Sequence, residues 1–491
     1  MRRSKFNLSH THLLTCDMGQ LVPIGVVEAL PGDTMQHHAA VLARVSPLAA
    51  PIMHPVSARV HHFFVPHRLT WTGNEEGATD GDNWEDFITG GKAGNNAATP
   101  PTIATTGADE KTLLDYMGIP PDRPLIDINA MPIRAFNMIY NEYYRDEDLV
   151  NEREMDDITI PQVAWGKDYF TAARPWTQKG PDVTIPLGEM APVATKAVSS
   201  ADISLQSGLN DNHEQFNLDS SGATLKMGIS GGDATSMLYA DLAEAIGGNV
   251  NDVRRAFAIQ RYQEARSKYG SRYTEYLRYL GVAPSDGRLQ RPEFLGGGRT
   301  QLNFSEVLQT GPETQAAGGT PFGVGDMYGH GIGALRSNKY RRFIEEHGYI
   351  ISCLSVRPKS IYQDGIHRSW LKTTKEEYWQ KELEHIGQQE IYNNEIYADT
   401  ASGMETFGYS DRYSEYREHP SLISGEFRDT LDYWHMARKF SAPPVLNQSF
   451  IDCVPTKRIY NEQTYDSLWI MVQHKMIARR MVSRSTAGRL Y

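Results

Sequence analysis

The chain has 491 residues and a mass of 55.1 kDa, and 40% of its residues are apolar while 22% are charged. This balance is typical of a globular protein and excludes a disordered or collagen-like chain. With 49 basic and 60 acidic residues the net charge is −11, which argues against a protein that coats nucleic acid with its whole surface.

Strands are predicted near the N-terminus. Residues 19–30 (GQLVPIGVVEAL) are apolar and β-branched and end at a turn-forming Pro-Gly-Asp sequence. Residues 57–69 (SARVHHFFVPHRL) predict a second strand. Because proline cannot donate a ladder hydrogen bond, Pro23 and Pro66 indicate sheet edges or bulges within these runs.

Long polar segments follow. Residues 73–107 are rich in Gly, Asn, Thr and Ala, and we expect a loop insertion over residues 73–130. Residues 191–235 are equally polar and show no helical period, which predicts an excursion over the protein surface.

Helices are predicted in three places. Residues 133–145 form a short one, and residues 251–281 form the clearest, with apolar and tyrosine residues at a spacing close to 3.6. A break is expected inside the long helix at Gly270-Ser271. Residues 375–385 (KEEYWQKELEH) are interpreted as a further helix.

Further strands are predicted toward the C-terminus, at residues 349–356, 450–454 and 467–473. Strands near both ends of a chain, joined by very long excursions, do not follow the strand–helix–strand order of a parallel sheet. The predicted fold is mainly β, a single-domain sandwich with large loop insertions, of which the jelly roll is the commonest form. Its strands are expected mainly from residues 19–71 and 346–475.

A histidine group is the candidate for a metal site: His54, His61, His62 and His67, with His37 and His38 upstream. His61 and His62 are adjacent, so they point to opposite faces of a strand, and no carboxylate lies within the run. We therefore expect hydrogen-bonded or interface histidines, and no metal or other cofactor.

Motifs of catalysis are missing from the sequence, which contains no GxxxxGK[ST], HExxH or GxSxG. The glycine string at residues 322–333 (FGVGDMYGHGIG) is spaced GxGxxxG without a preceding apolar strand, and is interpreted as a flexible loop with close backbone approaches. The three cysteines form no CxxC motif. No catalytic residue is predicted, and we expect a protein that is not an enzyme.

Basic residues gather at the two ends of the acidic chain. Such ends suit sequence-independent phosphate contacts. The candidate DNA-binding residues are Arg2, Arg3, Lys5, Lys475, Arg479, Arg480, Arg484 and Arg489. Arginines and tyrosines interleaved along residues 251–281 fit either nucleic acid or an acidic neighbouring subunit.

Specific strings also resemble a known family, the major capsid proteins of microviruses, and within it the gokushovirus-like branch. The strings stand in the order of that family: LVPIGVVEALPGDTM (21–35), SPLAAPIMHPVSARVHHFFVPHRLTW (46–71), GSRYTEYLRYLGVAPSDGRLQRPEFLGGG (270–298), EHGYIISCLSVRPKSIYQDG (346–365), FGYSDRYSEYREHPSLISGEFR (407–428) and LDYWHMARKF (431–440). Residues 73–130 and 160–235 match the family poorly, as variable surface loops would.

The resemblance implies an eight-stranded antiparallel viral jelly roll and a T = 1 icosahedral shell of sixty copies around circular single-stranded DNA of a small bacteriophage. Residues 191–235 are then the candidate outward insertion. The implied partners are genomic DNA, an internal scaffolding protein, a DNA pilot protein, a small basic DNA-binding protein and a host surface receptor. The implied location is the virion, after assembly in the host bacterial cytoplasm without membrane insertion.

Other hypotheses remain beside this one. A jelly-roll spike that binds a receptor or carbohydrate would show a shallow aromatic groove and would offer no use for the basic ends. A metal-dependent enzyme would need the histidine group to bind a metal ion.

Overall fold

A computed structural model describes residues 3–73, 82–90, 99–105, 109–121, 126–183, 193–195, 238–240, 250–308, 310, 327–399 and 401–483. The chain divides into two compact units, Met1–Thr177 with Ser267–Tyr491, and Gln178–Arg266. Among the described residues, no helix is both long and apolar enough to cross a membrane.

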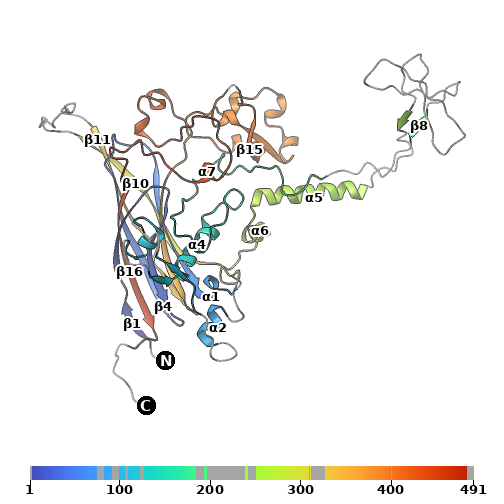
Figure 1. Cartoon of the computed structure of the whole chain (residues 1–491). Coiled ribbons are helices and arrows are strands. Elements are labelled where there is room, and N and C mark those ends of the chain that lie inside the picture. Colours follow the sequence, from blue (N-terminus) through green and yellow to red (C-terminus); the bar gives the residue numbers. More distant parts are fainter. Residues whose placement is uncertain are drawn as a thin grey trace. The chain divides into compact units, whose positions relative to one another are not determined.

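The larger unit is built on one antiparallel sheet of ten strands, which curls upon itself (Figure 1). Eight of these strands follow the order β1-β16-β4-β11-β10-β5-β13-β3, while β2 pairs with β16 and β12 with β4. Their bounds are β1 Ser4–Asn7, β2 His10–Cys16, β3 Leu21–Ala29, β4 Thr34–Val45, β5 Val56–Pro66, β10 Glu293–Leu308, β11 Met327–Arg336, β12 Tyr340–Phe343, β13 Gly348–Pro358 and β16 Leu468–Arg480.

Strand β10 joins the two halves of the curl. Its first part, from Glu293 to Leu302, pairs with β5, and its second part, from Asn303 to Leu308, pairs with β11. A bulge at Gly296, whose φ of 143° favours glycine, bends the strand between Phe294 and the pairs that follow. The mainly β, antiparallel jelly-roll fold predicted from the sequence is confirmed.

The interior of the curl is apolar because each strand turns alternate residues inward. Along β16 the inward residues, from Leu468 to Ala478, are buried while the residues between them are exposed or half-buried. The inner faces of both halves meet in one core, in which Ile24 and Leu354 pack with residues of the opposite half such as Val41, Ile470 and Val472. Burial of apolar area on this scale is the main favourable term for the fold.

A second apolar layer covers the outer face of the half formed by β3, β13 and β5. Helix α4 (Met131–Tyr143) lies there with the short α3 (Leu113–Tyr116). Phe136 of α4 is fully buried and belongs to one cluster with Phe63 of β5 and Ile351 of β13. Helix α4 therefore has one face that belongs to a core, as the helical prediction for residues 133–145 implies.

The connections between the strands contain further short helices, strands and turns. They are α1 His67–Thr70, α2 Trp84–Thr89, α7 Gln448–Ile451, β6 Thr102–Ala104, β7 Asp127–Asn129, β14 Gln388–Tyr392, β15 Thr406–Asp411, and the 3-10 turns η1 Arg368–Trp370, η2 Lys375–Glu377, η3 Lys381–Leu383, η4 Asn393–Glu395, η5 Ser414–Tyr416, η6 Gly425–Arg428 and η7 Asp432–Trp434. A separate core that includes Phe170, Tyr362 and Phe450 holds the long C-terminal connection together.

The long predicted helix is two helices, α5 (Val250–Tyr269) and α6 (Tyr273–Tyr279). Gly270 between them has a φ of 98°, a left-handed conformation that ends a helix and that glycine adopts without strain. The predicted break at Gly270-Ser271 is confirmed. Of the predicted surface insertion at residues 191–235, only β8 (Val193–Thr195) is described, paired with β9 (Leu238–Ala240), and the remainder lies outside the described residues.

The glycine string was wrongly interpreted as a loop in its second part, because residues from Met327 onward form β11. Its glycines recur every second residue and face the interior. A Cβ at Gly329 would clash with the Ala50 carbonyl oxygen, and one at Gly333 would clash with a Leu302 methyl carbon. The close approaches expected at these glycines are present, but they occur inside a strand and not in a flexible loop.

Two shorter predictions are also wrong. Residues 450–454 do not form a strand, because Asn447 caps the helical turn α7 by accepting the Phe450 N–H at 3.1 Å, and only an isolated bridge at Asp452 follows. Residues 375–385 form two 3-10 turns, η2 and η3, instead of one helix. Their side chains are mostly exposed, so no apolar face is available to stabilise a longer helix.

Candidate nucleic-acid interface

Six strands in one half of the curled sheet together carry positive charge and no carboxylate. Strands β1, β2, β4, β11, β12 and β16 contain no Asp or Glu, in a chain whose net charge is −11. Their charged residues are Lys5, Arg44, Arg336, Arg341, Arg342, Lys475, Arg479 and Arg480. The outward side of these strands is called the acid-free face below.

Strand register places the outward cations beside one another. Lys5 of β1 lies directly opposite Arg479 of β16, and Lys475 lies opposite His38 of β4. Directly opposed residues on one face have Cβ atoms about 5 Å apart. Like charges at that separation repel each other, so an anion bound between them would stabilise this part of the face.

The electrostatic field of the face is visible at His38. Its Nε2 lies 3.3 Å from Nη2 of Arg336. Burial lowers the pKa of His38 below its ordinary value, and the positive charges of Arg336, Lys475 and Lys339 lower the pKa further. Because Arg336 comes from β11 and Lys475 from β16, cations of separate strands act on one spot.

Exposure of the cations allows them to meet a ligand. Arg336, Arg341, Lys475 and Arg479 are exposed, and no carboxylate of the described residues lies within ion-pair distance of any of them. A protein gains little from surface cations that lack partners, whereas a polyanion that binds them releases its counterions.

The structure brings together part of the sequence-predicted set. Lys5, Lys475 and Arg479 share the acid-free face, and Arg3 stands at its end, where Nη1 donates to Oγ1 of Thr34 at 3.3 Å. The Arg3 guanidinium also lies 5.0 Å above the ring of Phe343. The remaining predicted residues at the extreme ends, Arg2, Arg484 and Arg489, lie outside the described residues.

Arg480 is placed differently from its neighbour Arg479. Its Nε lies 2.9 Å from Oδ2 of Asp33, whose side chain is fully buried, and its Nη2 donates to the Glu28 carbonyl oxygen at 2.5 Å. This guanidinium compensates a buried carboxylate. Its charge is therefore less available to an external anion than the charge of Arg479.

Sequence reasoning missed several cations of the face, namely Arg44, Arg336 and Arg341. They lie within β4, β11 and β12, which were not predicted as strands. A signal for them exists in the sequence: segments of alternating apolar and polar residues that contain Lys or Arg and no acid, although acids outnumber bases in the whole chain.

Cations of the helical segment are partly engaged inside the protein. The Nη2 of Arg272 donates to the carbonyl oxygens of Asn141 at 2.6 Å and Arg145 at 2.9 Å. Lys268 pairs with Asp411 at 2.6 Å. These contacts favour a role in holding the connections together over a role in binding nucleic acid.

The histidine group forms a hydrogen-bonded cluster between the two halves. Nε2 of His474 donates to the Ile24 carbonyl oxygen at 2.9 Å, so its neutral Nδ1 accepts from Nε2 of His37, also at 2.9 Å. Nδ1 of His37 is then free to accept the Tyr340 hydroxyl at 3.2 Å. The ring nitrogens of both His37 and His474 are thus satisfied with the two imidazoles neutral.

Three more histidines of the group are held by hydrogen bonds, whereas Nδ1 of His67 is buried without a hydrogen-bond partner among the described residues. His62 contacts the hydroxyls of Ser352 at 2.7 Å and Ser337 at 2.9 Å, while His61, on the opposite side of β5, contacts the Tyr144 hydroxyl at 2.7 Å. His54 Nε2 lies 2.8 Å from the Lys359 carbonyl oxygen. Among the residues that the structure describes, no group of histidine, cysteine and carboxylate side chains could hold a metal ion.

These features define a class of protein: an antiparallel jelly roll with long connections and one cationic sheet face. The family model described as "Capsid protein (F protein)" matches residues 1–488. The chain therefore belongs to this family of capsid proteins, and it was correct to expect a structural protein of the virion.

Relatives of known identity agree with the family. The chain is 33% identical to the capsid protein VP1 of Bdellovibrio phage phiMH2K, with 92% of this chain and 88% of the relative covered. It is 30% identical to the capsid proteins VP1 of Chlamydia phage 1, at 92% and 89% coverage, and Spiroplasma virus 4, at 91% and 87%. The resemblance to gokushovirus-like microvirus capsid proteins is confirmed.

Proposed function

We propose that this chain is the major capsid protein of a small bacteriophage, and that sixty copies assemble into a T = 1 icosahedral shell around circular single-stranded DNA. The acid-free face turns toward the genome in this proposal. The observation that carries it is the set of outward cations on β1, β4, β11, β12 and β16, whose strands contain no carboxylate.

Phosphate binding explains why the charge is distributed in this way. A shell that encloses nucleic acid needs an inner surface that attracts phosphates, while the protein as a whole stays acidic and soluble. Such contacts position a backbone without reading its sequence, which suits a container for an entire genome. The role needs no catalysis, so the protein is proposed to be non-enzymatic.

Self-assembly requires surface that a monomer leaves exposed. Helix α6 and its flanks expose a row of aromatic and apolar side chains that can be buried against a second copy. These residues are Tyr269, Tyr273, Tyr276, Tyr279, Leu280 and Val282. Repeated contacts between copies close a shell when their geometry obeys a point group.

The proposal is tested with the double variant Lys475→Ala and Arg479→Ala. The matched control is Arg288→Ala with Lys381→Ala, two exposed cations on connections outside the sheet. Particles are purified and counted by electron microscopy, and DNA per particle is measured. We expect the first variant to form shells with less DNA and the control to retain the parental content.

Equal DNA content in parent, variant and control particles would contradict the proposed direction of the face. A chain that never closes into uniform shells, but forms small oligomers that bind glycan, would favour a receptor-binding spike instead.

Partners of the assembly are proposed on the basis of the family: an internal scaffolding protein, a DNA pilot protein, a small basic DNA-binding protein and a host receptor. Residues 191–235 are proposed as the outward insertion. Shortening residues 205–225 should then change adsorption to host cells while shells still form, and insoluble protein would show that this segment belongs to the core.

A further inference from the structure

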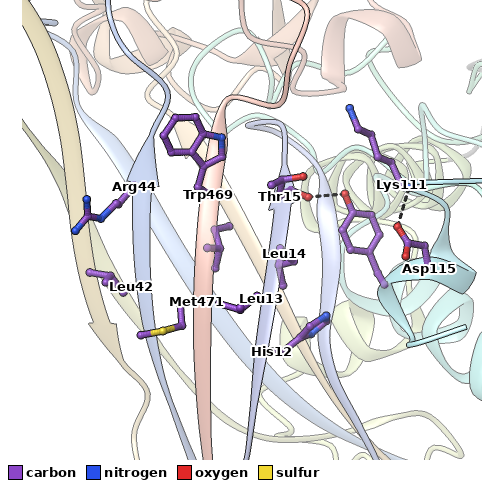
Figure 2. Close-up of a pocket in the computed structure, with 12 residues that line it drawn as sticks. His12, Leu13, Leu14, Thr15, Leu42, Arg44, Lys111, Asp115, Trp469 and Met471 are labelled. Atoms are coloured by element: carbon purple, nitrogen blue, oxygen red, sulfur yellow. Dashed lines mark hydrogen bonds between the residues drawn. The ribbon is translucent and has the colours of Figure 1, made fainter. Parts of the chain in front are cut away.

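An apolar groove lies on the acid-free face, at the end of β16 away from Arg479. It has a volume of about 640 Å³ and is lined by residues of β2, β4 and β16 together with α3 and Lys111 just before it (Figure 2). Leu13, Trp469 and Met471 are exposed by 72%, 44% and 43%, so large apolar side chains here face solvent in the single chain. Exposed surface of this kind marks a binding site.

Register fixes the neighbours of the indole. Trp469 lies directly opposite Thr15 of β2 on one side and Arg44 of β4 on the other. Met471, two residues further along β16 and on the same face, lies between Leu13 of β2 and Leu42 of β4. Figure 2 shows the indole of Trp469, the apolar side chains around it and the Arg44 guanidinium on adjacent strands.

The charged residues of the groove differ in whether they have an ion-pair partner. Lys111 pairs with Asp466 at 2.9 Å, and Asp115 accepts the backbone N–H of Lys111 at 3.0 Å. Arg44, in contrast, has no carboxylate partner among the residues that the structure describes. The groove therefore offers one aromatic ring beside one cation that is available to an anion.

The groove continues the cationic surface rather than standing apart from it. Trp469, Lys475 and Arg479 are all outward residues of β16, because residues an even number apart share one face of a strand. Trp469 and Lys475 are about 20 Å apart along the strand, at about 3.4 Å per residue. A single strand of DNA held by the cations can therefore reach the indole.

We infer that Trp469 is a stacking platform for an unpaired base of single-stranded DNA, with Arg44 contacting a neighbouring phosphate. This inference rests on the proposed function and adds a contact to the base itself. Every base has a π-face, so a stacking contact is tolerant of sequence, as packaging of a whole genome requires. Double-stranded DNA keeps its bases stacked on one another and would gain nothing from the platform.

The test compares two oligonucleotides of about 16 nucleotides, a length that spans known single-strand sites. One is oligothymidylate, and the other is an abasic strand with the same phosphates. The purified full-length protein should bind the first roughly tenfold more tightly than the second, because only the first can stack. Trp469→Ala should remove this difference and leave affinity for the abasic strand unchanged.

Two further variants keep the test decisive. Trp469→Leu preserves apolar bulk, so it reports on the ring even if the alanine variant folds poorly, whereas Trp469→Phe should retain most of the preference. Lys475→Ala should weaken binding of both oligonucleotides by the same factor, because it removes only a phosphate contact.

Each other outcome overturns the inference in a recognisable way. Equal binding of the two oligonucleotides by the parent protein would refute base stacking while phosphate binding stands. Failure to bind either one would refute the proposed function together with this inference. A Trp469→Ala protein that binds both like the parent but cannot assemble would assign the groove to contact between protein chains.

Discussion

The two halves of the curled sheet share one core and differ on their outer faces. The outer face of β3, β13 and β5 is apolar and is covered by α4 within the same chain. The strands of the other half, β16, β4 and β11, carry cations without acids, and Arg336, Lys475 and Arg479 are exposed on their outer face. The comparison teaches that the apolar residues of the inner faces hold the two halves together as a jelly roll. The residues on each outer face determine whether that face is covered by a helix of the same chain or stays available to a partner.

Acidification should loosen the contact between the halves most strongly. Burial lowers the pKa of His37 to about 2, of His62 to about 3 and of His474 to about 4. An unfolded histidine titrates near 6.5, so these groups stabilise the fold fully above that pH, and the contribution is lost as pH falls toward the folded values. We expect a loss of roughly 5 kcal/mol between pH 7 and pH 5.

Chemical denaturation at a series of pH values measures this effect. His62→Asn should reduce the loss of stability between pH 7 and pH 5 by the contribution of one buried histidine. A stability that stays constant from pH 7 to pH 5 would show that the cluster is not buried between the halves.

Truncating a side chain to alanine should lower the free energy of unfolding more on the face covered by α4 than on the acid-free face. Phe136→Ala removes a fully buried ring beneath α4, and we expect a loss of about 4 kcal/mol in the free energy of unfolding. Ile332→Ala, on the outward side of β11, should cost less than about 1 kcal/mol. Similar losses at both sites, measured by urea denaturation, would mean that the acid-free face is covered in solution.

Alanine substitution of the neighbouring Arg479 and Arg480 should have different effects on stability, because only Arg480 pairs with a buried carboxylate. Arg480→Ala leaves the buried carboxylate of Asp33 without its guanidinium, and we expect a loss of about 2 kcal/mol in stability. Arg479→Ala should change stability by no more than about 0.5 kcal/mol. If thermal unfolding shows equal shifts for the two variants, the alternation assigned to this end of β16 is incorrect.

The smallest effect is expected for a single phosphate contact. Arg341→Ala should weaken single-stranded DNA binding uniformly and reduce the slope of log affinity against log salt by about 1. Arg342 is its natural control, because it pairs with Glu293 at 2.7 Å. A salt titration in which Arg342→Ala has the larger effect would place the DNA on the other side of β12.

Strands rich in β-branched residues could be predicted from the sequence, and β3, β5, β13 and part of β16 were. Strands β4 and β11 were not predicted, because their inward positions hold small or polar residues such as His37, Ala39, Gly331 and Gly333. Packing inside the curl selects these residues, and packing is not visible in local composition.

The candidate site was predictable only in part, for the same reason. Clustering of charge near the termini indicated Lys5, Lys475 and Arg479, which do share a face. Composition alone gave Arg479 and Arg480 the same role, and only strand alternation separates them. Arg44 and Arg336 join the face through pairing between segments hundreds of residues apart, which no single segment reveals.

The position of β16 has a consequence for biosynthesis. This final strand lies between β4 on one side and β1 and β2 on the other, so the first strands made can find their partner only after residue 480 has left the ribosome. The cationic surface is completed by the same step, because Arg479 has to arrive beside Lys5. A nascent polypeptide therefore lacks the complete cationic surface until β16 has been synthesised and has paired with β1 and β4.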